Sequence, residues 1–172
     1  MTIQIDYETD RELDIDYARL ADMVADKILD SENCPYEASV NLVLTDNEEI
    51  KRVNSEFRFV GAPTDVLSFP MIPFEKPADY SIIEDKDEYF DLDTGELLLG
   101  DVMISVDKVW SQAEEYGHSR EREFSFIFWD MIIWSRGKRP LWRKNSRRPL
   151  TLWESQDEPS GILPACVRRT GK

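Results

Sequence analysis

An abrupt change in composition near residue 130 limits what this chain of 172 residues can fold into. Residues 1–135 carry 11 basic and 32 acidic side chains, a net charge of −21, whereas residues 136–172 carry 10 basic and 3 acidic side chains, a net charge of +7. Four of the five tryptophans also lie from Trp129 onward. We therefore predict one domain over residues 1–128, followed by a poorly ordered, basic, tryptophan-rich tail over residues 129–172.

Within the predicted domain, apolar residues recur at strand spacing in some segments and at helical spacing in others. The predicted strands cover residues 2–7, 38–44, 66–69 and 97–106, and the predicted helices cover residues 16–29, 48–57 and 107–116. Asp46 is the expected N-cap of the second helix, with Glu49 placed as in a capping box, and Asp107 is the expected N-cap of the third. Gly117 is expected to end the third helix. This order predicts an α+β fold in which helices cover a small mixed β-sheet.

The segment between the last two predicted strands is strongly acidic. Residues 71–96 hold nine acidic and two basic side chains, which predicts a solvated loop. The alternative is a divalent-cation loop over residues 85–91, but this stretch lacks the sixth-position glycine and terminal glutamate of an EF-hand.

Targeting signals and disulfide patterns are not apparent in the sequence. The chain has no signal-peptide pattern and no apolar stretch of about 18 residues, so we expect a cytoplasmic protein. Cys34 and Cys166 lie far apart and show no CxxC spacing, which predicts two free thiols.

Three side chains are candidates for chemistry. Arg58 ends a predicted helix just before a Gly-Ala-Pro turn, where its guanidinium could bind a phosphodiester or simply complement the helix dipole. Asp101 could be a general base or metal ligand, or could hold loop backbone by accepting N–H bonds. His118 is the single histidine of the chain. One histidine without a second ligand at suitable spacing does not form a zinc site, so a capping or packing role is expected for it.

Longer motifs lie in three segments of the chain. They are Asn54-Ser-Glu-Phe-Arg-Phe-Val-Gly-Ala-Pro-Thr-Asp-Val-Leu-Ser-Phe-Pro70, Gly100-Asp-Val-Met-Ile-Ser-Val-Asp107 and Glu115-Tyr-Gly-His-Ser-Arg-Glu-Arg-Glu-Phe-Ser-Phe126. Over residues 1–126 the chain resembles the YbeY family of bacterial endoribonucleases and ribosomal RNA maturation factors. The resemblance implies a metalloprotease-like α+β domain and a zinc-dependent hydrolase that cuts single-stranded RNA in 16S rRNA 3′-end maturation.

The same resemblance extends to partners and to one catalytic residue. It implies single-stranded or ribosomal RNA and components of small-subunit assembly as partners, in ribosome biogenesis. Arg58 matches the arginine proposed to be catalytic in the family. Most members carry aspartate where this chain has Gly61, which is a departure within the same turn.

The family's zinc site is three histidines in the pattern HxxxHxxxxxH, and this chain has one histidine. At that place it instead has an apolar stretch, Phe124 to Trp134, which predicts a buried helix. Read one base early, the possible codons of residues 126–134 encode (His/Tyr)-(Leu/Ile/Phe)-Leu-Gly-(His/Tyr)-Asp-(His/Asn/Tyr)-(Met/Leu). This fits the family's His-Leu-x-Gly-Tyr-Asp-His-Met.

We interpret the C-terminal part as the product of a short deletion that changed the reading frame. The alternative is a divergent but genuine C-terminus, in which the basic tail could act as an RNA-binding arm. We expect no zinc at the usual site and impaired catalysis. The alternative function is a metal-free, non-catalytic module of ribosome biogenesis or RNA binding.

Overall fold

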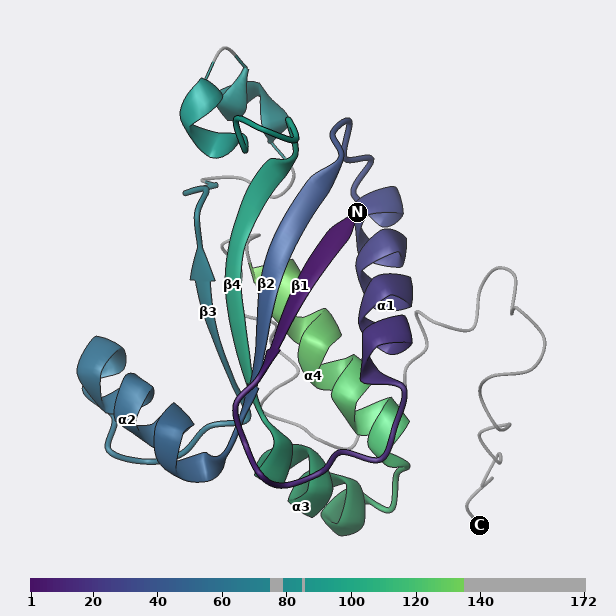
Figure 1. Cartoon of the computed structure of the whole chain (residues 1–172), viewed down its shortest axis with the longest axis vertical. Coiled ribbons are helices and arrows are strands. Elements are labelled where there is room, and N and C mark those ends of the chain that lie inside the picture. Colours follow the sequence, from purple (N-terminus) through teal and green to yellow (C-terminus); the bar gives the residue numbers. More distant parts are fainter. Residues whose placement is uncertain (75–78, 85, 135–172) are drawn as a thin grey trace, which may run out of the picture. The chain divides into compact units, whose positions relative to one another are not determined.

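The computed structural model describes residues 1–74, 79–84 and 86–134 (Figure 1). The strands are β1 (Thr2–Tyr7), β2 (Ala38–Thr45), β3 (Val66–Pro70) and β4 (Leu97–Ser105). The helices are α1 (Tyr17–Ser31), α2 (Asn47–Arg58), α3 (Val106–Tyr116) and α4 (Arg120–Trp134), with 3₁₀ turns η1 (Tyr80–Ile83) and η2 (Asp87–Tyr89). Most of the predicted tail, with Cys166, lies outside the described residues. The predicted domain boundary at residue 128 stays a prediction, and α4 continues across it.

The four strands form one mixed sheet in the order β1-β2-β4-β3. Strands β1, β2 and β4 are parallel, and β3 pairs with β4 in the antiparallel direction. Leu42 of β2 lies between Ile5 of β1 and Val102 of β4. Helix α1 is the crossover that the parallel pair β1 and β2 requires. The prediction of an α+β fold with helices over a small mixed sheet is confirmed.

The main hydrophobic core lies between one face of this sheet and helices α1, α3 and α4 (Figure 1). Val40, Leu42 and Leu44 alternate along β2 and are buried there, as the two-residue period of a strand requires. Phe124 and Phe128, one helical turn apart on α4, are fully buried, and their rings stack with centroids 6.1 Å apart. The predicted buried helix is therefore confirmed over its first turns.

Helix α2 begins largely as its sequence predicts. The Asp46 carboxylate accepts hydrogen bonds from the backbone N–H groups of Glu48 and Glu49, at 3.0 and 2.9 Å. Asp46 is thus the N-cap. The Glu49 carboxylate pairs with Arg52 at 2.6 Å instead of reaching back as in a capping box.

The acidic segment after β3 is more ordered than its composition predicts. It contains the two 3₁₀ turns, and Ile72 and Ile83 are buried in a second cluster with Ala38 and Leu97. The prediction of a solvated loop was wrong for this part, because two isoleucines anchor it against the ends of β2 and β4. Asp91, proposed as part of a cation loop, accepts backbone N–H bonds from Asp93 and Thr94.

Candidate functional site

The turn from α2 to β3 presents the predicted site residue Arg58. Arg58 is the last residue of α2 and its side chain is exposed. Among the described residues, no hydrogen bond or ion pair of this guanidinium is found, whereas Arg52 on the same helix pairs with Glu49 and Glu56. Arg58 therefore offers a free planar donor at the surface, of the kind that binds phosphate oxygens in pairs.

Asn54 holds the backbone of this turn from inside. It is 3% exposed, and its Nδ2 donates to the Ala62 carbonyl oxygen at 2.7 Å. The Val60 N–H donates to the Asn54 carbonyl oxygen at 3.3 Å, and Ser55 Oγ donates to the Val60 carbonyl oxygen at 3.3 Å. The sequence marked Asn54 only by its position one turn before Arg58. A polar residue at an otherwise apolar position of a helix was the signal that could have revealed its role.

The other end of the turn is fixed by Asp65. Its carboxylate accepts from the Thr64 hydroxyl and from the Val66 N–H, both at 3.0 Å. Its carbonyl oxygen accepts from the Ser105 N–H at 2.9 Å. The Thr-Asp of the sequence motif therefore ties the turn to the point where β4 meets α3.

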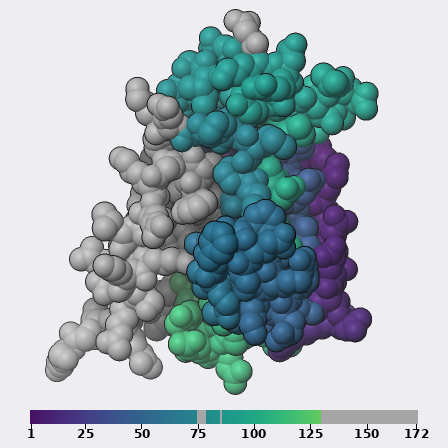
Figure 2. All heavy atoms as spheres, turned by 90° about the vertical axis from the view of Figure 1, so that its left-hand side faces the viewer, coloured from purple at the N-terminus to yellow at the C-terminus, as the bar shows by residue number. Residues whose placement is uncertain are grey.

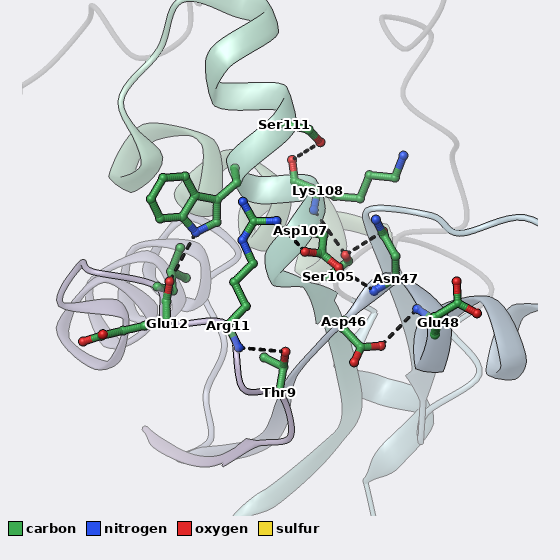
Figure 3. Close-up of polar contacts among 12 residues, drawn as sticks. Thr9, Arg11, Glu12, Asp46, Asn47, Glu48, Ser105, Asp107, Lys108 and Ser111 are labelled. Carbon is green, nitrogen blue, oxygen red and sulfur yellow. Dashed lines mark hydrogen bonds and ion pairs between the residues drawn. The ribbon is translucent and has the colours of Figure 1, made fainter.

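A network around Asp107 joins the starts of α2 and α3 (Figure 3). Asp107 was predicted to cap α3, but Ser105 is the N-cap, because its Oγ accepts from Lys108 N–H at 3.2 Å. Asp107 instead accepts from Asn47 N–H at 2.9 Å and from Arg11 at 2.6 Å. Burial raises the pKa of Asp107, but these two hydrogen bonds lower it by more, so that its pKa lies below the ordinary value. We therefore assign this network a structural role, in which it holds the starts of α2 and α3 together.

Gly100 shows why the second motif needs glycine before Asp101. Its φ is +120°, and a Cβ there would lie 2.2 Å from the carbonyl oxygen of Phe69 on β3. Asp101 itself is exposed on β4, where its Oδ1 accepts from Asn41 Nδ2 on β2 at 2.7 Å. The expectation that Asp101 holds loop backbone was wrong, because its side chain points out from a paired strand and meets its cross-strand neighbour.

His118 lies between α3 and α4, and its side chain pairs with a buried carboxylate. Its Nδ1 lies 3.3 Å from Glu123 Oε2, and its ring packs near Tyr116 and Phe126, each with centroids 6.1 Å away. Burial raises the pKa of Glu123, the contact with His118 opposes this shift, and the charge of Asp65 adds to it. This geometry agrees with the packing role expected for His118.

The described residues do not fit the zinc ion that the family resemblance implies. Within residues 1–74, 79–84 and 86–134, no group of three His, Cys, Asp or Glu side chains is placed to hold a metal ion. The chain has one imidazole, and it is paired with Glu123. A catalytic zinc site needs three protein ligands and an open position. The described residues therefore present an exposed guanidinium at Arg58 and no set of side chains that fits a zinc ion.

Taken together, the fold and the site define an α+β domain that presents an exposed arginine on a hydrogen-bonded turn beside a mixed sheet. The model of a family described as Endoribonuclease YbeY matches residues 4–131. The chain therefore belongs to the YbeY family. Residues 132–172 lie outside this match.

Curated proteins of the same description are similar over most of the chain. Endoribonuclease YbeY of Lachnoclostridium phytofermentans is 52% identical over 128 residues, covering 74% of this chain and 78% of that protein. The Agathobacter rectalis protein has the same identity and coverage, and that of Lachnospira eligens is 46% identical over 132 residues, also covering 74% and 78%.

Among solved structures, the chain is similar to the solution structure of TM1509 from Thermotoga maritima. The TM-score is 0.40 at 22% identity, covering 72% of this chain and 64% of that one. In the part of the chain that the structure describes, no helix is long and apolar enough to cross a membrane.

Proposed function

We propose that this chain is a YbeY-type protein of ribosomal RNA maturation that binds single-stranded RNA and whose zinc-dependent endoribonuclease step is impaired. The observation that carries the proposal is the contrast between Arg58 and His118. Arg58 is exposed and without a partner among the described residues, on a turn fixed by Asn54. The single histidine is paired with a buried glutamate.

The RNA part of the proposal is supported by the family and by the chemistry of Arg58. The relatives are described as endoribonucleases, and a guanidinium fork holds two phosphate oxygens at once. In an intact relative, a group of this kind could also stabilise charge that grows on the phosphate during cleavage. We assign Arg58 this phosphate contact. Ribosomal RNA and small-subunit assembly components are the partners we propose, which places the protein in the cytoplasm.

The impaired cleavage step follows from the side chains that this chain has available to bind zinc. When bound, zinc supplies an activated water and a Lewis acid to such a hydrolase. This chain has one histidine in total, His118, whereas the family pattern requires three at the ligand positions. A change of reading frame after residue 126 accounts for the loss, because the neighbouring frame of residues 126–134 is compatible with the family motif.

A side-by-side assay with the Lachnoclostridium phytofermentans relative tests both parts. Zinc content, binding of a single-stranded RNA and cleavage of that RNA are measured on both purified proteins. We expect both to bind RNA, and only the relative to hold one zinc per chain and to cleave. Zinc-dependent cleavage by this chain would refute the impairment, and the absence of RNA binding would refute the RNA part.

The nucleotide sequence of the gene tests the origin of the defect independently. We expect the frame one base before the codons of residues 126–134 to read Gly-Tyr-Asp or Gly-His-Asp, with histidines at the ligand positions. A neighbouring frame that encodes other residues at the ligand positions would contradict a frameshift and favour a divergent C-terminus.

A further inference from the structure

We propose that Phe59, with Phe57 beside it, is a stacking surface for unpaired bases of single-stranded RNA, while Arg58 between them contacts a phosphate. The inference rests on the proposed RNA binding and adds the feature of RNA that the site recognises. It concerns the end of α2 and the turn that follows, which form a rounded lobe in Figure 2, drawn in blue.

Large apolar side chains at this turn are exposed in succession. Phe57 is 60% exposed, Phe59 is 91% exposed and Val60 is 47% exposed. Only scattered single residues of this kind are exposed elsewhere in the described chain, such as Met23, Leu92 and Tyr116. Scattered exposed apolar residues are ordinary, whereas three of them within residues 57–60 indicate an interaction surface.

The backbone at Phe59 is unfavourable for the residue it carries. Phe59 ends α2 in the left-handed conformation, with φ 58° and ψ 30°. Glycine and asparagine adopt this conformation readily, whereas a bulky residue there is an outlier. With 91% of Phe59 exposed, burial in this structure does not compensate for the cost. An unfavourable conformation without compensation in the fold points to a ligand that Phe59 contacts.

The side chains of Phe57, Arg58 and Phe59 are presented on a fixed backbone. The hydrogen bonds of Asn54 and Ser55 hold both sides of the turn, and the Phe57 ring packs edge-on against Phe69 of β3, with centroids 5.1 Å apart. A rigid aromatic surface loses little conformational entropy when a base stacks on it.

Charge favours RNA bases over the RNA backbone as the main source of affinity. Residues 1–135 carry a net charge of −21, which disfavours extensive phosphate contacts. On α2, Arg52 pairs with Glu49 and Glu56, whereas Arg58 is adjacent in sequence to both exposed phenylalanines and is the cation we assign to a phosphate. Aromatic side chains next to an arginine in the chain are the combination that single-strand-binding proteins use, with stacking that tolerates any base.

The test compares Phe59→Asn with a matched control, Leu92→Asn, in the full chain. Leu92 is also 91% exposed and lies in the turn before β4. Binding of a fluorescent oligouridylate is measured by anisotropy, and thermal unfolding is measured on the same samples. We expect Phe59→Asn to weaken binding by about 5- to 150-fold, the effect of losing one base stack. The same substitution should raise Tm by about 3 °C, because asparagine suits the left-handed backbone.

An abasic RNA of the same length separates stacking from other contacts. It should bind the wild-type chain and the Phe59→Asn chain equally, and Leu92→Asn should change neither ligand's affinity. If the wild-type chain binds oligouridylate and Phe59→Asn binds it equally well, stacking on Phe59 is refuted while the proposed RNA binding stands. An equal loss on the abasic RNA also refutes stacking. A wild-type chain that binds no single-stranded RNA refutes the proposed function and this inference together.

Discussion

The turn after α2 and the junction of α3 with α4 both carry residues of the family motifs, but they differ in what surrounds the charged side chains. At the α2 turn, Arg58 is exposed and no partner for it is found among the described residues. At the α3–α4 junction, Glu123 is 6% exposed and pairs with His118, and Phe124 beside it is fully buried. Ligand binding needs side chains without partners, whereas stability needs paired and packed ones. Under the proposed function, the first region contacts RNA, whereas the pairing and packing of the second region stabilise the fold.

The largest expected difference between the two regions is in stability. Phe124→Ala should lower the free energy of unfolding by about 3–5 kcal/mol, because it leaves a cavity in the main core. Phe57→Ala, at a ring that is 60% exposed, should cost less than about 1 kcal/mol. Urea denaturation of both variants measures the difference. Similar losses would show that the α2 turn is as much part of the core as α4.

Removing the Asn54 side chain, which supports the α2 turn, should have an intermediate effect on the free energy of unfolding. Asn54→Ala removes the bond to the Ala62 carbonyl and should cost about 1–3 kcal/mol. Amide hydrogen exchange at Val60 should accelerate, since its N–H is bonded to the backbone at Asn54. Ser111→Ala, which removes an exposed side-chain hydrogen bond within α3, is the control with a smaller loss and with unchanged exchange at Val60. If the exchange at Val60 is unchanged in Asn54→Ala, this side chain does not fix the turn.

At the α3–α4 junction, pH should affect stability through Glu123. Its pKa in the folded protein is raised above the ordinary value of 4.5, mainly by burial. The folded state then binds the proton more tightly than the unfolded state. The contribution is fully present below the unfolded pKa and is lost as pH rises through the folded pKa.

Glu123→Gln should therefore flatten the fall in stability that begins as pH rises past about 4.5. Glu121→Gln, at an exposed position of the same helix, is the matched control for the loss of one carboxylate. Thermal unfolding across this pH range measures both. A wild-type profile with the same slope as Glu123→Gln would show that the contact with His118 cancels the effect of burial, so that folding does not change the pKa of Glu123.

Features that depend on residues close together in the chain could be predicted from the sequence, whereas features that depend on distant residues could not. The strands and helices followed from spacing, and Asp46 begins helix α2 and Gly117 ends helix α3 as their residue types indicate. Asp107 and Asp101 were assigned wrongly, because their partners Arg11 and Asn41 lie 96 and 60 residues away in the chain. The burial of Ile72 and Ile83 depended on the ends of β2 and β4, which the acidic composition around them does not reveal. The left-handed backbone at Phe59 carried no sequence signal, since glycine or asparagine would be expected there.

The smallest expected effect on stability is that of replacing Arg58. Because the Arg58 side chain is exposed and no partner for it is found in the described residues, Arg58→Ala should change the free energy of unfolding by no more than about 0.5 kcal/mol. Under the proposed function, the same substitution removes one phosphate contact. The dependence of log affinity for oligouridylate on log salt concentration should then become shallower by about 0.7, the value for one contact on a single strand.

Arg19→Ala is the matched control, because Arg19 is an exposed arginine on α1, away from the α2 turn. It should leave the salt dependence as in the wild type. Equal slopes for Arg58→Ala and Arg19→Ala would show that both act only through the overall charge. A shallower slope for Arg58→Ala alone, with unchanged stability, would establish that the α2 turn contacts phosphate and that its arginine is kept free for that contact.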